Sequence, residues 1–484
     1  MKRKKTPAGL RTACAATLLA GMLAPAQALA NGRYPASQQL VVDPGNPARL
    51  WLRATYGVLT SPDAGKNWDY LCEAAVGFNT TEDPMFGVTK NGTLFAASNE
   101  GLLTTRDEGC SFGGDPDVGQ RITRDLAVEG DQSHVLVLTT ESRPNGNYLL
   151  RVHRSDEASA NFAPIGGPIS QDVLGLTLDP APSDPKRIYV SGVVYAQSAA
   201  AIEAGVLSPD ASAGDAPGVL LRSKDGGMTW ERLYIPGATV SYQPFIAAVH
   251  PTNPDVLYVR VMGPPQTFDS VESFLLYSED GGDHFREVFR KKADMLGFAL
   301  SKDGQTVFVG MGDTHDPSRP TDASVLGIYA ASAPDLTFSR RLVGQVSCLT
   351  ESDAGLYVCG GHDTVGWEVG LSTDGGQTAT PLFDFKKSRG PLACAAGTPS
   401  SAACENTWPS VCGQLGVSCT LGPPPLDFDA SFPPPKTTPA RKKDGGCGCE
   451  TPARDSSPPA GGAGGALLAL LVLGARRRRR STYS

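Results

Sequence analysis

A short acidic run in the last third of the chain carries the residue types that proton transfer needs. Residues 312–317 read GDTHDP, which places Asp313, His315 and Asp316 within four positions. Carboxylates and imidazole often act as general acid or base, and Asp313, His315 and the nearby Arg319 are equally suited to binding a polar ligand. A solvated loop without chemistry is the alternative, and the surrounding elements must decide between these interpretations.

A second group of acids lies in a short string that recurs along the chain, here called the Asp-Gly string. It reads SKDGGMTW at 223–230, and related strings occur at 61–68, 105–112, 278–285 and 372–379. Paired catalytic acids must lie within roughly 5–10 Å of one bond, and calcium needs several oxygen ligands in one loop. Each string supplies one to three acids and belongs to a different repeat. We therefore expect these acids to be structural and not catalytic carboxylates or calcium ligands.

The Asp-Gly string suits a tight turn between two strands. Its aspartate can accept hydrogen bonds from backbone N–H groups within the turn, and the glycine two positions later supplies a backbone conformation closed to other residues. The final aromatic residue buries a large apolar face, so the last string, which ends in Ala379, is expected to be looser. The residues assigned to this structural role are Asp63, Gly65, Trp68, Asp107, Gly109, Asp225, Gly227, Trp230, Asp280, Gly282, Phe285, Asp374 and Gly376.

The strings belong to a larger repeat of about 40–60 residues. Each unit runs through alternating segments such as RLWLRA or VLYVRV, which have the period of half-buried strands, before it reaches the string. Degenerate strings close the third unit (154–162) and the sixth unit (332–338). Four short strands per unit predict an all-β, seven-bladed β-propeller. The seven units begin near Gln38, Met85, Leu126, Leu174, Pro244, Leu296 and Gln345.

The Asp-Gly string resembles the Asp-box, or BNR repeat, S/T-x-D-x-G-x-T-W/F. Families that bear this repeat include sialidases, sortilin-like receptors, some glucanases and a photosystem assembly factor. The resemblance covers about residues 38–385. It implies a propeller in which each string joins the third and fourth strands, on the face away from the active site.

The sialidase resemblance implies an arginine triad, a Tyr–Glu nucleophile pair, an acid Asp and an Arg-x-Pro motif. GRYP (32–35) offers Arg33 and Pro35, but the aromatic residue before the arginine is missing. An arginine tied to a neighbouring acid at the surface is therefore the alternative for Arg33. Nothing in the spacing selects the other candidates, which are Arg222, Arg260, Arg319, Glu272 and Tyr277.

The loops between second and third strands should lie on the face opposite the strings. They are short in the first unit and long in the fourth (195–218), the fifth (263–273) and the sixth (312–324). Functional residues are commonly carried by loops above a rigid scaffold. We therefore expect the ligand site on this face, with surface decoration as the alternative.

Both ends of the chain have the composition of targeting segments. Residues 1–30 combine a basic start, a short apolar stretch and a small-residue end, which is typical of a secretory signal peptide. GGCGCE (445–450) is followed by a polar spacer, an apolar run (465–475) and five arginines. This order resembles the C-terminal sorting signal of myxobacterial surface proteins, which implies processing near Cys447 and Cys449. Retention by a short transmembrane helix is the alternative.

Eight cysteines lie between these ends, and an even count in an exported chain predicts disulfides. Cys348 and Cys359 flank a turn, which predicts a pair across a hairpin. The last four lie close together and predict a small stapled module; zinc is the rival, but neither a CxxC motif nor a nearby histidine supports it. The eight are Cys72, Cys110, Cys348, Cys359, Cys394, Cys404, Cys412 and Cys419.

The segments predict a domain order from export signal to anchor. They are the signal peptide (1–30), the propeller (31–389), the cysteine-rich module (390–421), a disordered Pro/Gly-rich stalk (422–464) with the sorting cysteines, and a hydrophobic tail with the arginine cluster (465–484).

Charge and motifs limit the partners. Without the ten basic residues of the two ends the net charge is −17, which repels nucleic acid. No metal or nucleotide motif is present, so neither a metal nor a cofactor is expected. We expect an exported monomer on the outer membrane of a Gram-negative cell that binds a glycan or a protein without catalysis. An exo-acting glycoside hydrolase, sialidase-like or glucanase-like, is the alternative.

Overall fold

The described part of the chain is built almost entirely from short antiparallel strands. The computed structural model describes residues 36–77, 83–144, 147–157, 161–195, 199–203, 205, 216–263, 272–313 and 322–419. These residues form seven four-stranded sheets, and each sheet pairs four strands that follow one another in the sequence. The predicted all-β, seven-bladed propeller is therefore confirmed, and every sheet begins within four residues of its predicted start.

The strands of the first to third sheets are β1 (Ser37–Val42), β2 (Leu50–Ala54), β3 (Gly57–Ser61), β4 (Asp69–Cys72), β5 (Met85–Val88), β6 (Leu94–Ser98), β7 (Gly101–Thr105), β8 (Gly113–Gly114), β9 (Ile122–Val128), β10 (Val135–Ser142), β11 (Tyr148–Ser155) and β12 (Phe162–Pro164). Those of the fourth and fifth sheets are β13 (Val173–Ala181), β14 (Asp184–Val194), β15 (Pro217–Ser223), β16 (Glu231–Thr239), β17 (Gln243–Val249), β18 (Leu257–Met262), β19 (Ser273–Ser278) and β20 (Arg286–Lys291). Those of the sixth and seventh sheets are β21 (Asp294–Leu300), β22 (Thr306–Gly312), β23 (Gly327–Ser332), β24 (Ser339–Val343), β25 (Cys348–Ser352), β26 (Gly355–Cys359), β27 (Val369–Ser372) and β28 (Thr380–Phe383).

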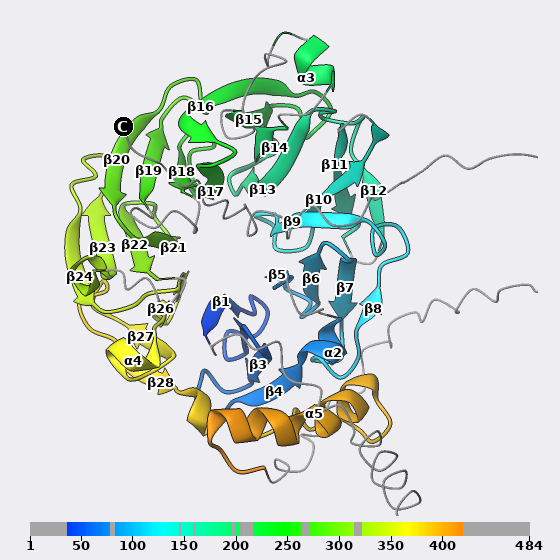
Figure 1. Cartoon of the computed structure of the whole chain (residues 1–484), viewed down its shortest axis with the longest axis vertical. Helices are drawn as coiled ribbons and strands as arrows, with labels where there is room; N and C mark the ends of the chain where they lie inside the picture. Colours follow the sequence, from blue (N-terminus) through cyan, green and yellow to red (C-terminus); the bar gives the residue numbers. More distant parts are fainter. Residues whose placement is uncertain are drawn as a thin grey trace, which may run out of the picture. The chain divides into compact units, whose positions relative to one another are not determined.

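The first strands of successive sheets line the axis of a closed ring. Each of them contacts the first strand of the next sheet, and β25 of the seventh sheet contacts β1 of the first (Figure 1). Short helical segments interrupt the strands at α2 (Glu73–Val76), α3 (Ala199–Glu203), α4 (His362–Val365), η4 (Ala323–Val325) and η5 (Phe385–Lys387). The arrangement brings the seven innermost strands around one central space.

Every Asp-Gly string lies between the third and fourth strands of its sheet. The string at 223–230 joins β15 to β16, and the other four occupy the same corner of their sheets. The two degenerate strings, 154–162 and 332–338, also lie there, between β11 and β12 and between β23 and β24. The loops between second and third strands therefore leave the opposite ends of the strands.

The glycine two positions after the aspartate of each string meets two requirements. Gly282 has a φ of 96°, and a Cβ built on it would lie 2.4 Å from Leu220 Cδ2 on the preceding sheet. A side chain there would strain the backbone and clash with the neighbour. The glycines at the same place in the other strings face a side chain of their preceding sheets, in the pairs Gly65–Leu382, Gly109–Leu71, Gly227–Ile165 and Gly376–Ile328.

The polar atoms of the strings are used inside the turns. In the fourth sheet the Ser223 hydroxyl accepts from Gly227 N at 2.8 Å, and Asp225 Oδ1 accepts from Thr229 N at 2.9 Å. In the seventh sheet Asp374 Oδ1 accepts from Thr378 N at 3.0 Å. The turn before Ala379 thus keeps the hydrogen bonds of the aromatic-ended strings, so any looser packing is confined to the apolar side.

A C-terminal segment, residues 384–419, crosses the junction of the first and seventh sheets; we call it the clasp. Its residues 389–392 lie along the outer strand β4, where Tyr70 N donates to Gly390 O and Leu392 N to Tyr70 O, both at 2.8 Å. The disulfides Cys72–Cys404 and Cys110–Cys394 join it to the first and second sheets. The ring is therefore closed by a covalent strap and not by a strand shared between the ends.

The clasp corrects the expectation of a self-contained cysteine module. Only Cys412–Cys419 lies within residues 390–421, whereas Cys394 and Cys404 pair with distant blades. About thirty residues cannot bury a core of their own, and the segment packs its apolar side chains on the propeller instead. Cys348–Cys359 joins directly opposed residues of β25 and β26, as the hairpin spacing predicts.

The clasp contains the one long helix of the described chain, α5 (Pro399–Leu415), which the sequence analysis did not predict. Thr398 caps its start and Gly416 ends it with a φ of 65°. Figure 1 shows α5 beside β4 and α2. Its buried residues recur at helical spacing and join the core cluster between the first and seventh sheets, which contains Trp68, Tyr70, Phe383 and Trp408.

Both ends of the chain lie outside the described residues. They contain the predicted signal peptide (1–30), the predicted stalk (422–464) with Cys447 and Cys449, and the predicted tail (465–484). Among the residues that the structure describes, none of the helices is long and apolar enough to cross a bilayer.

Candidate functional site

A large concave feature of the described chain lies at the axis of the ring. A cavity of about 1210 Å³ is lined by residues of the innermost strands β1, β9, β13, β17, β21 and β25. Residues of the connections between second and third strands, such as Asp313 and Gly360–Thr364, also line it. The cavity therefore reaches the face where we expected the ligand site.

The predicted acidic run is only partly described. Asp313 lines the central cavity at the end of β22, and its backbone oxygen accepts a hydrogen bond from Gln345 Nε2 at 3.0 Å. His315, Asp316 and Arg319 lie outside the described residues, as does Arg33. Their roles remain predictions from sequence.

Two other acids, Asp125 on β9 and Asp179 on β13, line the same cavity. Asp125 is fixed by two backbone groups, because its Oδ1 accepts from Leu126 N and its Oδ2 from Leu178 N, each at 2.9 Å. Burial raises the pKa of Asp125 to about 7, although these hydrogen bonds oppose the shift. Burial and then the charge of Asp125 raise the pKa of Asp179 to about 8. One site thus contains two coupled carboxyls that retain protons near neutral pH.

Arg260 on β18 is the cation whose charge acts on both acids. Its Nη1 donates to Met295 O and Leu296 O at 3.0 and 2.9 Å, and its guanidinium lies 5.6 Å from the centre of the Phe245 ring. Arg53 on β2 makes the same kind of contact in the first sheet, with a 2.8 Å hydrogen bond to Pro84 O. Both arginines therefore connect a second strand to the start of the next sheet.

Glu368, just before β27, lines the cavity near the ring closure. It is 3% exposed, its Oε1 accepts from His362 N at 3.2 Å, and its Oε2 accepts from the Ser37 hydroxyl at 3.4 Å. Burial is the main cause that raises the pKa of Glu368 to about 8, and Asp384 and Asp363 add to it. The folded chain therefore binds this proton more tightly than the unfolded chain.

Glu368→Gln is expected to make the free energy of unfolding depend less on pH between about 5 and 8. The raised pKa of Glu368 adds to the free energy of unfolding of the native protein. This added stability is fully present below the ordinary pKa of 4.5 and is lost as the pH rises through about 8. Urea unfolding at a series of pH values gives the slope of the free energy of unfolding against pH. Equal slopes for the native protein and the variant would contradict the claim that Glu368 keeps its proton in the folded protein.

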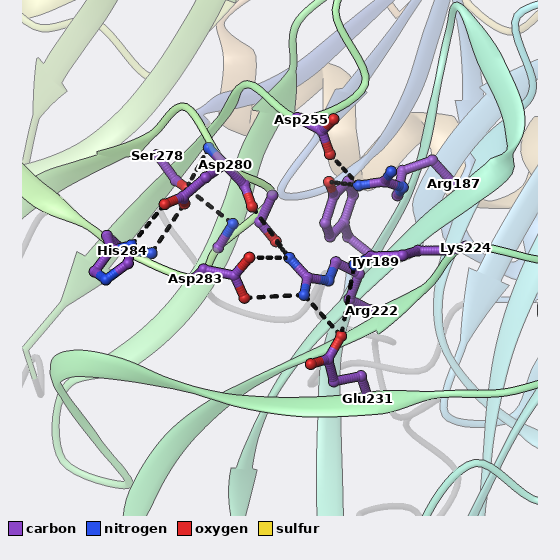
Figure 2. A network of polar contacts seen from close by, with 12 residues as sticks. Arg187, Tyr189, Arg222, Lys224, Glu231, Asp255, Ser278, Asp280, Asp283 and His284 are labelled. Atoms are coloured by element: carbon purple, nitrogen blue, oxygen red, sulfur yellow. Dashed lines mark hydrogen bonds and ion pairs between the residues drawn. The ribbon is translucent and has the colours of Figure 1, made fainter.

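Arg222 does not approach Arg260, so the two do not form part of an arginine triad. Figure 2 shows Arg222 at the string of the fifth sheet, where its Nη1 donates to Gly281 O at 2.9 Å and its guanidinium binds both oxygens of Asp283. Glu231 pairs with the same guanidinium at 2.7 Å. This network joins the fourth sheet to the fifth, a structural role.

The Tyr–Glu candidates are also separated. Glu272 precedes β19 and pairs with Arg290 at 2.7 Å, whereas Tyr277 lies near the end of that strand under the guanidinium of Arg286. Five residues along a strand span roughly 16 Å. These two side chains therefore have different partners and do not form one nucleophile pair.

The acids of the strings are dispersed, one string to a sheet. Hydrogen bonds within the turns hold the pKa values of Asp225, Asp280 and Asp374 down to about 2. For Asp225 and Asp374 the first of these bonds comes from the threonine four positions later. Permanently ionised carboxylates that are bonded to their own turns do not suit proton transfer.

One group of possible metal ligands occurs in the described part of the chain. Ligand atoms of Glu129, Asp131 and His134 lie within 4.8 Å of one another in the turn between β9 and β10. Glu129 already binds Arg154 through both oxygens, at 2.9 and 2.6 Å. Both oxygens of the Glu129 carboxylate therefore already bind Arg154. We interpret the three residues as a structural part of the turn and not as a metal site.

The comparisons with known proteins give distant structural likenesses and no family. No family model and no curated protein match the chain. Among solved structures, an ancestral GH74 enzyme is similar over 73% of this chain and 47% of its own, with 13% identity and a TM-score of 0.49. YCF48 from Cyanidioschyzon merolae is similar over 69% and 94%, with 9% identity and a TM-score of 0.40. The chain spans about half of the length of the GH74 enzyme.

Asp125, Asp179 and Glu368 were missed by the sequence analysis. They occur in TRDLAV, LTLDPA and GWEVGL, where one acid interrupts an apolar strand or its edge. An unpaired acid in such a segment costs free energy unless its environment compensates. That signal exists in the sequence, but only the folded ring shows that all three acids line a common cavity.

Proposed function

We propose that this protein is an exported β-propeller that binds a carbohydrate in its central cavity. The observation that carries the proposal is the cavity of about 1210 Å³ at the ring axis, which presents carboxyls, an arginine and the rings of Phe245 and Phe298 together. Ligand sites typically combine apolar surface with a few convergent polar groups. Sugars present both an apolar face and hydroxyl groups, which suits such a lining.

The charge of the cavity selects among carbohydrates. Its lining contains five acids, Asp125, Asp179, Asp313, Asp363 and Glu368, against two arginines and one histidine. An anionic sugar would have to compete for both arginines with the backbone carbonyls to which they already donate, and protonated carboxyls offer no positive charge in their place. We therefore propose a neutral or cationic carbohydrate, in contrast to the anionic substrate of a sialidase.

Export and surface display remain part of the proposal. The described chain contains four disulfides, two of which join segments 332 and 284 residues apart. Disulfides of this kind persist in oxidising compartments outside the cytoplasm. They support the predicted signal peptide, and the clasp leads directly into the proposed stalk.

The proposed function is tested by binding of the purified full-length protein to a panel of neutral, cationic and anionic oligosaccharides. Calorimetry reports binding, and a reducing-sugar assay on the same samples reports cleavage. We expect saturable binding of neutral or cationic members without release of sugar. Binding confined to anionic members, or to none, would contradict the proposal.

A glycoside hydrolase is the second candidate, and one observation favours it. Asp125 and Asp179 share a cavity, are electrostatically coupled and have pKa values near 7 and 8. Glycosidases use one protonated carboxyl as the acid and one ionised carboxyl as the base or nucleophile, and a coupled pair that shares one proton would supply both forms. Sugar release that disappears in both Asp125→Asn and Asp179→Asn would favour the hydrolase over the binding protein.

A further inference from the structure

Asp179 is a carboxyl that lines the central cavity next to Asp125. Asp125 receives two backbone N–H groups, but Asp179 accepts a hydrogen bond from none of the described residues. Its side chain is partly exposed where it lines the cavity. The carboxyl is thus available to a ligand that supplies a donor.

Arg260 adds an independent feature to the same cavity. Its guanidinium lines the cavity, and its Nη1 donates to two carbonyls of β21. A guanidinium has five N–H donors, so these two hydrogen bonds do not use all of them. The cavity therefore offers both an acceptor and a cationic donor within one electrostatically coupled group.

These observations identify the chemistry of the ligand, an inference that rests on the proposed function. We propose that Asp125, Asp179 and Arg260 form a subsite for a 2-amino-2-deoxy sugar, with the sugar ammonium at the two carboxyls and a neighbouring sugar oxygen at Arg260. A vicinal amino alcohol supplies a charged donor and an acceptor on adjacent carbons. Hydrogen bonds between charged groups are roughly twice as strong as neutral ones.

Binding of the ammonium must be linked to proton release. The charge of a bound cation favours the ionised form of Asp179, whose pKa is about 8 in the free protein. At pH 6.0 the free subsite is protonated, so a bound amino sugar displaces about one to two protons. Its affinity rises with pH while the amine keeps its charge.

The test uses the full-length protein and three probes: a trimer of β-1,4-linked glucosamine, the fully N-acetylated trimer, and tri-lysine. Titration calorimetry at pH 6.0 in two buffers with different ionisation enthalpies gives the affinity and the number of protons released. We expect the glucosamine trimer to bind most tightly, with proton release. Asp179→Asn should weaken it about 10- to 100-fold, as expected for a hydrogen bond to a charged group.

Asp353→Asn is the matched control, because it removes the same charge from an exposed site that pairs with Lys302 outside the cavity. It should leave the affinity unchanged, and thermal melting verifies that both variants fold. Tight binding of the N-acetylated trimer with no effect of Asp179→Asn overturns the amino-sugar subsite but leaves carbohydrate binding intact. Equal binding of tri-lysine overturns the saccharide assignment, and absence of binding by both trimers counts against the proposed function as well.

Discussion

Replacing Cys72 and Cys404 by alanine is expected to lower the free energy of unfolding by about 4 kcal/mol. The disulfide Cys110–Cys394 lies inside the same loop and remains intact, so the substitution frees segments 72–110 and 394–404 of the unfolded chain. Cys72–Cys404 also fixes α5 over the junction of the first and seventh sheets, where the Tyr70 and Trp408 rings lie 5.5 Å apart. Urea unfolding of the non-reduced proteins measures the change.

The hairpin disulfide Cys348–Cys359 is the matched control, because it joins residues only 11 positions apart within one sheet. Its removal should cost about 3 kcal/mol by the same chain-entropy argument. If removal of the hairpin pair destabilises the protein as much as removal of the clasp pair, the clasp does not close the ring.

Trp68→Ala is expected to cost about 3–5 kcal/mol, the range for a fully buried large side chain. Trp68 is 1% exposed, its Nε1 donates to Gly65 O at 2.9 Å, and its ring lies 4.8 Å from that of Phe383 on the seventh sheet. The substitution therefore opens a cavity at the ring closure. The midpoint of urea unfolding, at constant slope, measures the loss.

Trp230→Ala provides the comparison at the same position of the fourth sheet. Trp230 makes the equivalent hydrogen bond to Gly227 O at 3.0 Å but is only partly buried. We expect a smaller loss, about 1–2 kcal/mol, because less apolar surface is removed from contact. Equal losses would mean that the turn itself, and not the closure of the ring, determines the cost.

The propeller was predictable because its signals are local and repeated. Alternating strands, Pro- and Gly-rich turns and the Asp-Gly strings each report on a few residues, and seven repeats reinforce one another. Even the degenerate string of the sixth sheet lies where it was predicted, in the connection between the third and fourth strands, β23 and β24. The clasp was not predicted because its disulfides join distant residues, and pairing cannot be read from cysteine spacing. Helix α5 had local signals, in Thr398-Pro399, in Gly416 and in the spacing of Cys404, Trp408 and Val411.

The candidate site was harder to predict than the fold. Asp313 was selected because it stands in a conspicuous polar run, and it does line the cavity. Asp125 and Asp179 are single acids within apolar strands 54 residues apart, and their proximity depends on the order of sheets around the ring. Arg260 was considered only as one of several arginines. Nothing in the sequence around it reveals that its side chain lines the same cavity as Asp125 and Asp179.

A crystal structure of the protein with its tightest-binding oligosaccharide tests the central claim most directly. The account predicts that the sugar lies at the axis of the ring, against the carboxyl of Asp179 and the guanidinium of Arg260. A sugar bound at the Asp-Gly strings, or on the outer strands, with the central cavity unchanged, would contradict it.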